Sequence, residues 1–219
     1  MATFDRRIVR PSTLRFLQAC HARTPFHLAG GAALAGVHLR HRLSRDADLF
    51  FHDRQSHRDA VALLQEVAVE AGATIRVVRD AGTFARAVLT GADGEVDIDL
   101  VFDAVADVDG PDSVEGVQVE SLADLRANKL TCVLSRSEPR DLVDLLFLDR
   151  AGYPPEADLA LALAKDGSID PGVLAWLLAE FPIEPLPQML EPLPHGELKA
   201  FRDALAERLR RLVVPDSQD

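Results

Sequence analysis

The stretch Leu28–Phe51, LAGGAALAGVHLRHRLSRDADLFF, decides the expected fold of this chain. It begins with apolar residues typical of a buried strand, turns at Gly30 and Gly31, and continues with a predicted short helix over residues 32–41. Two glycines between a strand and a helix let the backbone come close to a ligand, and the start of a helix offers N–H groups to an anion. The pair indicates either a phosphate-binding turn or a tight connection between the two elements.

The same stretch ends in D-A-D-L-F-F, where Asp46 and Asp48 are separated by one residue. On a strand, residues i and i+2 point to the same side, so we expect both carboxylates on one face while Ala47 and Leu49 face the core. Two acids this close repel each other unless a cation neutralises them, and Mg²⁺ prefers carboxylate oxygens. The alternative is a solvent-facing strand with ordinary polar alternation, and the two phenylalanines that follow argue against it.

A second predicted strand, residues 96–102, repeats this pattern with Asp97 and Asp99. A third carboxylate from a neighbouring strand is what a two-metal phosphoryl-transfer site needs. We favour Asp97, which lies nearer the start of the strand, over Asp99. An exposed edge strand would explain the same alternation. A hairpin turn is predicted over residues 91–94, because Gly and Asp separate the strand from the one before it.

The 219 residues divide by pattern into mixed strands and helices over residues 1–120 and helices alone over residues 121–219. This order predicts an α+β fold of two subdomains. The formal net charge of −11 argues against broad nucleic-acid binding, although a local basic patch would still allow RNA binding. Cys20 and Cys132 are expected to be free thiols in a reducing cytoplasm. No apolar run is long enough to span a membrane, and we expect no secretory signal.

Two blocks of sequence together resemble one family. The motif G-G-x-A-L followed by H-x-x-H-R-x-S-x-D-x-D-x-F resembles the AbiEii/AbiGii-type toxin nucleotidyltransferases of the DNA polymerase β-like superfamily. The matching residues are Gly30, Gly31, Ala33, Leu34, His38, His41, Arg42, Ser44, Asp46, Asp48 and Phe50. The second block, K-L…R…P-R-D-L-V-D-L, matches at Lys129, Leu130, Arg136 and residues 139–145. The resemblance covers about residues 25–150.

The resemblance implies a nucleotidyltransferase-like mixed sheet with flanking helices and a helical C-terminal subdomain. It also implies an NTP substrate and Mg²⁺, with site residues in three groups. The metal and catalytic carboxylates are Asp46, Asp48 and Asp97. The further catalytic residues are Lys129, on phosphate or the leaving pyrophosphate, and Asp141. The nucleotide-binding residues are Gly30, Gly31, Ser44, Arg140 and Asp144. A salt bridge between Arg140 and Asp144, which lie at helical spacing, is the structural alternative.

The function that follows is Mg²⁺-dependent transfer of an NMP from an NTP to an acceptor, with tRNA as the favoured acceptor. The protein would be the toxin of a toxin–antitoxin system, with a cognate antitoxin, in the cytoplasm. One departure is Ala32, where many family members carry a hydroxyl for a phosphate; its absence would weaken nucleotide binding by roughly 0.5–1.5 kcal/mol.

Three alternatives stay open. One is transfer to a small molecule or a protein. The second is an inactive binding module of the same fold. The third is a zinc or iron hydrolase that joins Asp46 or Asp48 to His38, His41, His52 and His57.

Overall fold

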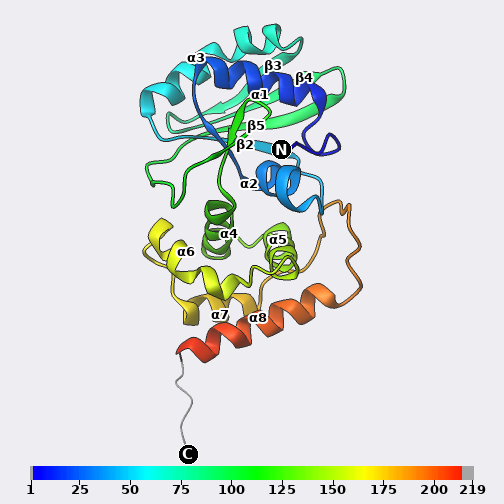
Figure 1. Ribbon diagram of the computed structural model, residues 1–219, viewed down its shortest axis with the longest axis vertical. Coiled ribbons are helices and arrows are strands. Elements are labelled where there is room, and N and C mark those ends of the chain that lie inside the picture. Colours follow the sequence, from blue (N-terminus) through cyan, green and yellow to red (C-terminus); the bar gives the residue numbers. More distant parts are fainter. Residues whose placement is uncertain (1, 214–219) are drawn as a thin grey trace, which may run out of the picture. The chain divides into compact units, whose positions relative to one another are not determined.

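The computed structural model describes residues 2–213, and these divide into two compact units between Leu122 and Ala123 (Figure 1). The first unit contains a seven-stranded mixed sheet with helices packed on it. In the described part of the second unit, the regular elements are helices. The predicted α+β class, with a mixed sheet followed by a helical part, is confirmed.

The sheet of the first unit has the strand order β3-β4-β5-β2-β1-β7-β6. β2 runs parallel to β5, β1 runs parallel to β7, and the other neighbouring pairs are antiparallel. The strand bounds are β1 His27–Ala29, β2 Asp46–Phe51, β3 Thr74–Asp80, β4 Phe84–Gly91, β5 Gly94–Phe102, β6 Asp112–Val114 and β7 Val117–Val119. The predicted hairpin is present, because Gly91 pairs with Gly94 between β4 and β5.

Two long helices pack together against the sheet in the first unit, α1 (Pro11–Arg23) and α3 (Arg54–Glu70) (Figure 1). The helices contribute buried residues such as Phe16 and Leu64, and the strands contribute Leu49 and Ile98, each at most 1% exposed. Burying one such side chain fully stabilises the fold by about 1.5–3 kcal/mol. Burial of the apolar residues Ala47, Leu49 and Phe51 therefore fixes which face of β2 points into the core.

The helix after the glycine pair differs from the prediction. It begins at Gly30 itself, as α2 (Gly30–Ala33), and continues as a π-helix over Leu34–Leu39. Arg40 ends it in a left-handed conformation with φ of 56°. His41 therefore lies beyond the helix, and the prediction of a helix to residue 41 is wrong at its end. Hydrophobic periodicity does not distinguish the wider π-helical turn from an α-helical one.

The second unit consists of α4 (Leu122–Ser135), α5 (Pro139–Arg150), the 3₁₀ helix η2 (Pro155–Asp158), α6 (Leu159–Lys165), α7 (Pro171–Ala179) and α8 (Glu197–Val213). The last two helices pack closely on each other. The buried face of α8 carries Leu198, Phe201, Leu205 and Leu209 at the spacing of an amphipathic helix. Within residues 2–213, we find no helix with the length and apolar character needed to cross a membrane.

Candidate active site

The two aspartates of the D-x-D motif lie on the central strand β2, between β1 and β5. Asp46 and Asp48 are half-buried on one face, whereas Ala47, Leu49 and Phe51 are at most 1% exposed on the other. The predicted alternation is confirmed. Core packing of the three apolar residues therefore holds both carboxylates on the same side of the sheet.

The parallel pairing of β2 with β5 brings the second acidic pair beside the first. Asp46 is in register with Asp97, and Asp48 is in register with Asp99. Because registered neighbours of a sheet point to the same side, four carboxylates line one face. The sequence predicts that each pair shares a face, and the register joins the two pairs at one place.

Three of these carboxylates converge. Oxygens of Asp46, Asp48 and Asp99 all lie within 4.8 Å of one another, an arrangement that could hold a metal ion. Asp97 is not part of this group. The sequence favoured Asp97 and kept Asp99 as the alternative; the geometry favours Asp99, which is 4% exposed and lies one step further into the sheet beside Asp48. Carboxylate oxygens at this spacing match the ligand preference of Mg²⁺.

An arginine that the sequence analysis did not single out holds the third carboxylate. Arg86, on β4, donates from Nε to Asp99 Oδ1 over 2.7 Å and from Nη2 to Asp99 Oδ2 over 2.5 Å. The hydrogen bonds that Arg86 donates to Asp99, together with the negative charges of Asp99, Asp97 and Asp46, raise the pKa of Arg86. The guanidinium therefore offsets part of the negative charge of the cluster.

The signal for Arg86 was present in the sequence. Counting back along both strands from the hairpin pair Gly91 and Gly94 places Arg86 opposite Asp99, as the structure shows. An arginine opposite a buried aspartate on adjacent antiparallel strands is a cross-strand ion pair.

Gly30 leaves room for the carboxylate of Asp48. Its φ is +61°, and a Cβ built on it would lie 2.0 Å from Asp48 Oδ2. A side chain at this position would therefore collide with Asp48 and would also strain the backbone. The first glycine of the pair serves the carboxylate cluster directly, in addition to any role at a phosphate.

Gly31 is adjacent to two polar side chains of the following loop. A Cβ on Gly31 would lie 2.6 Å from Ser44 Oγ and 2.9 Å from a guanidinium nitrogen of Arg42. Ser44 Oγ donates to Asp46 Oδ1 over 3.1 Å, so this hydroxyl links the glycine pair to the cluster. Ala32 is 3% exposed. Ser44 therefore places a hydroxyl beside Gly31, the residue before Ala32, where many family members carry a hydroxyl of their own.

The loop that carries Ser44 is anchored by buried polar residues. Arg42 is 2% exposed and donates from Nη1 to the carbonyl of Leu43 over 3.0 Å, and His41 is fully buried. Within residues 2–213, neither His38 nor His41 joins a metal-type group with Asp46 or Asp48. The same holds for His52 and His57, so the part of the chain that the structure describes shows no metal-type group that supports the alternative of a zinc or iron hydrolase.

The predicted residues of the second block form a buried ion network within the second unit. Lys129 Nζ lies 3.0 Å from Asp141 Oδ1 and 2.6 Å from Asp144 Oδ2. Arg136 donates two hydrogen bonds to Asp141, over 2.9 Å and 3.0 Å. Both aspartates are fully buried and Lys129 is 3% exposed. Arg140 pairs with Glu138 over 2.6 Å.

The charges of this network balance, with two cations on two carboxylates. Burial acts to raise the pKa of Asp141, but Lys129 and the hydrogen bonds from Arg136 outweigh it and lower that pKa. Two buried carboxylates on successive turns of α5 would be unstable without these cations. The network therefore stabilises α4 against α5, whatever further role Lys129 has.

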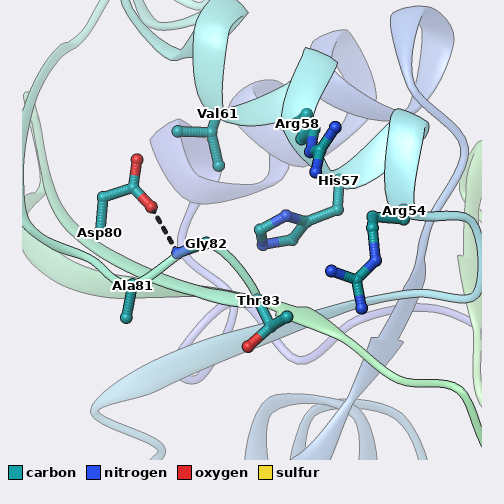
Figure 2. A pocket seen from close by; sticks show the side chains of 8 residues that line it. All are labelled: Arg54, His57, Arg58, Val61, Asp80, Ala81, Gly82 and Thr83. Atoms are coloured by element: carbon teal, nitrogen blue, oxygen red, sulfur yellow. Dashed lines mark hydrogen bonds between the residues drawn. The ribbon is translucent and has the colours of Figure 1, made fainter.

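A cavity of about 410 Å³ lies apart from the carboxylate cluster, between the start of α3 and the connection from β3 to β4 (Figure 2). It is lined by Arg54, His57, Arg58, Val61, Asp80, Ala81, Gly82 and Thr83. Asp80 accepts a hydrogen bond from the backbone N–H of Gly82 over 3.0 Å, which shapes its rim. None of the residues predicted for the reaction lines this cavity, so we do not assign the reaction to it.

Three solved structures share the fold, and two of them are described as nucleotidyltransferases. JHP933 from Helicobacter pylori matches with a TM-score of 0.59 and 22% identity, over 91% of this chain and 90% of its own. A proposed nucleotidyltransferase from H. pylori matches with a TM-score of 0.58 and 20% identity, over 95% and 97%. The nucleotidyltransferase toxin MenT4 of Mycobacterium tuberculosis H37Rv gives a TM-score of 0.55 and 17% identity, over 94% and 89%. These likenesses establish the fold.

The family follows from the sequence comparison. The profile of the nucleotidyl transferase AbiEii toxin family, of a type IV toxin–antitoxin system, matches residues 15–216. The chain therefore belongs to the AbiEii nucleotidyltransferase toxin family, and the predicted enzyme class is confirmed. No curated protein sequence matches the chain.

Proposed function

We propose that the protein transfers an NMP from an NTP to a hydroxyl of an acceptor, with tRNA as that acceptor, and releases pyrophosphate. Family membership supports the reaction class. The observation that carries the proposal is the convergence of Asp46, Asp48 and Asp99 within 4.8 Å on adjacent strands. Three half-buried or buried carboxylates on one face repel one another, and a divalent cation bound between them would neutralise this repulsion.

The residues fit magnesium. The donor set is oxygen only, the three carboxylates converge, and Gly30 leaves the space that Asp48 occupies. Asp46 and Asp48 would hold the ion, and when bound Mg²⁺ would polarise the reacting phosphate and neutralise charge on the leaving pyrophosphate. Asp99 would orient the acceptor hydroxyl or accept its proton, and Arg86 would keep the Asp99 carboxylate directed at the other two.

The remaining predicted residues keep proposed roles. Gly30, Gly31 and Ser44 would contact the triphosphate, since the glycines expose backbone and Ser44 adds a hydroxyl. Lys129 and Asp141 are proposed for catalysis, and Arg140 and Asp144 for nucleotide binding. Asp141 and Asp144 are ion partners of Lys129. A variant of Lys129 must therefore be checked for folding before any loss of activity is assigned to the reaction.

A partner and a location complete the proposal. The type IV toxin–antitoxin description of the family supports a cognate antitoxin. Cys20 and Cys132 are free thiols in the structure, as predicted, and this supports a reducing compartment, for which we propose the cytoplasm.

The test is a transfer assay with the purified chain, Mg²⁺, each labelled NTP in turn, and total tRNA. We expect label in tRNA with the wild type, and a loss of at least about 100-fold in Asp48→Asn. Asp59→Asn removes an exposed carboxylate of α3 and is the matched control, which should transfer label as the wild type does. Unchanged pyrophosphate release by Asp48→Asn would overturn the proposed metal site.

The other outcomes separate the alternatives. Label in a small molecule or in protein, with none in tRNA, would replace the proposed acceptor and keep the reaction. The absence of NTP turnover together with the absence of Mg²⁺-dependent nucleotide binding would favour an inactive binding module.

A further inference from the structure

A second cluster of ligating side chains lies in the first unit, outside the carboxylate site. His27 is the first residue of β1, His52 directly follows β2, and Asp107 belongs to the segment after β5. One ligating atom of each lies within 4.8 Å of the others. His52 is four residues beyond Asp48, which is about 13 Å along an extended strand. The cluster is therefore separate from the site proposed for Mg²⁺.

The distances show that Asp107 faces both imidazoles at once. Its Oδ2 lies 2.9 Å from His27 Nδ1, and its Oδ1 lies 3.2 Å from His52 Nε2. The centroids of the two imidazole rings are 5.1 Å apart, and their planes are inclined by 64°. Side-chain exposure is 20% for His27, 31% for His52 and 16% for Asp107, so the cluster is shielded but open to solvent.

A second observation concerns the tautomer of His52. Its Nδ1 lies 3.1 Å from the backbone carbonyl of Asp103, and a carbonyl only accepts, so Nδ1 carries the proton and donates it. In the neutral ring, Nε2 then presents its lone pair to Asp107. Two acceptors at 3.2 Å repel each other unless a cation lies between them or Nε2 gains a proton. Histidines that bind a metal commonly donate their other N–H to a carbonyl in this way.

We propose that His27 Nδ1, His52 Nε2 and Asp107 form a binding site for a zinc-type divalent cation. The donor set of two imidazole nitrogens and one carboxylate suits Zn²⁺ and Co²⁺ and is a poor match for Mg²⁺. Bond lengths of about 2.0–2.1 Å in a tetrahedron separate neighbouring ligand atoms by about 3.3 Å. One ligand atom from each of the three residues lies within 4.8 Å of the others, so small side-chain movements would bring them to this spacing. The fourth position is open to water or to a group of a ligand.

The consequence is a link between three segments that are far apart in the sequence. The cation joins the start of β1, the end of β2 and the segment after β5. Because it binds the folded chain through ligands that separate on unfolding, it stabilises the first unit by RT ln(1 + L/Kd), where L is the free cation concentration. This effect does not depend on nucleotide transfer.

The test uses the full chain, freed of metal with a chelator, and Co²⁺ as a spectroscopic probe for Zn²⁺. We expect one equivalent of Co²⁺ to give the intense visible bands of a tetrahedral site, and Zn²⁺ to displace it. His52→Gln and, independently, His27→Gln should each abolish these bands and weaken Zn²⁺ binding at least tenfold. Zn²⁺ should also raise the Tm of the wild type but not of these variants.

Two control variants separate this site from the others. Asp48→Asn alters the proposed Mg²⁺ site and should keep the Co²⁺ bands, and His195→Gln, in the second unit, should also keep them. Bands that persist in both His27→Gln and His52→Gln would overturn the proposal. Absence of Zn²⁺ binding by the folded wild type would also overturn it and would leave only the contacts of the two imidazoles with Asp107.

Discussion

Replacing Gly30 by alanine tests whether the glycine pair is required by the carboxylate cluster. The new Cβ would lie 2.0 Å from Asp48 Oδ2, and such contacts are essentially absent below 3.0 Å. The carboxylate must therefore move by about 1 Å, and a displacement of that size costs on the order of 100-fold in rate, or about 2.7 kcal/mol. The backbone at φ +61° adds about 1–2 kcal/mol of strain for any residue with a Cβ.

Gly72 provides the matched control for this variant. Its φ is +71°, and a Cβ built on it has no atom within 4 Å. Gly72→Ala therefore introduces the same kind of strain without a collision. In urea unfolding, we expect the free energy of unfolding to fall by about 1–2 kcal/mol in Gly72→Ala. In Gly30→Ala it should fall by the same amount or slightly more. Only Gly30→Ala should lose Mg²⁺-dependent pyrophosphate release and Mg²⁺ affinity.

The result that would refute this reasoning is a Gly30→Ala enzyme with turnover within about threefold of the wild type while it remains folded. An equal loss of activity in Gly72→Ala would also refute it, because general destabilisation would then explain both variants.

Four further predictions concern stability and reactivity. Arg86→Met should lower the free energy of unfolding by about 1–2 kcal/mol, a value reduced for the partial exposure of the arginine. Mg²⁺ should raise the Tm of this variant more than that of the wild type, because the ion replaces the lost positive charge near Asp99. Lys129→Met should lose about 3–5 kcal/mol in denaturant unfolding at pH 7, since it removes a cation from a fully buried network. The pKa of Asp141 is lowered in the folded chain. The ionised Asp141 therefore stabilises the fold above about pH 4, and this stabilisation is lost as the pH falls through the folded-state pKa. Below about pH 4 the free energy of unfolding of the wild type should therefore fall more steeply with pH than that of Lys129→Met. Burial raises the pKa of Cys20 to about 11, so its alkylation at pH 8 should be far slower in the folded chain than in urea.

The Arg86 and Lys129 variants each have a matched control. Arg76→Met removes an exposed arginine of β3 and should change neither Tm nor its response to Mg²⁺. Lys199→Met breaks an exposed pair on α8 and should change the free energy of unfolding little. A Lys129→Met protein as stable as the wild type, or rapid alkylation of folded Cys20, would contradict the burial on which these predictions rest.

The local part of the site was predictable from the sequence. Strand periodicity places Asp46 and Asp48 on one face, because a strand repeats every two residues and the apolar residues between them must be buried. The hairpin at residues 91–94 was also predictable, and it sets the pairing of Arg86 with Asp99. These features depend on neighbours within a few residues or across one tight turn.

Other features needed the folded chain. The end of the helix after Gly30 was predicted two residues too late, because hydrophobic periodicity reveals neither the π-helical turn nor the left-handed conformation at Arg40. The pairing of Lys129 with Asp144 was not anticipated, since helical spacing suggested Arg140 as the partner. Spacing along one helix predicts only pairs within that helix and cannot predict contacts with residues of a second helix.

By itself, the sequence determined the class of the protein, the two acidic strands and the glycine that borders one of them. Only the tertiary structure decided that Asp99, more than Asp97, meets Asp46 and Asp48. It also decided that His27, His52 and Asp107 converge. The physical reason is that alternation tells which side of its own strand a residue occupies. The register between strands about fifty residues apart is set by the packing of the whole sheet.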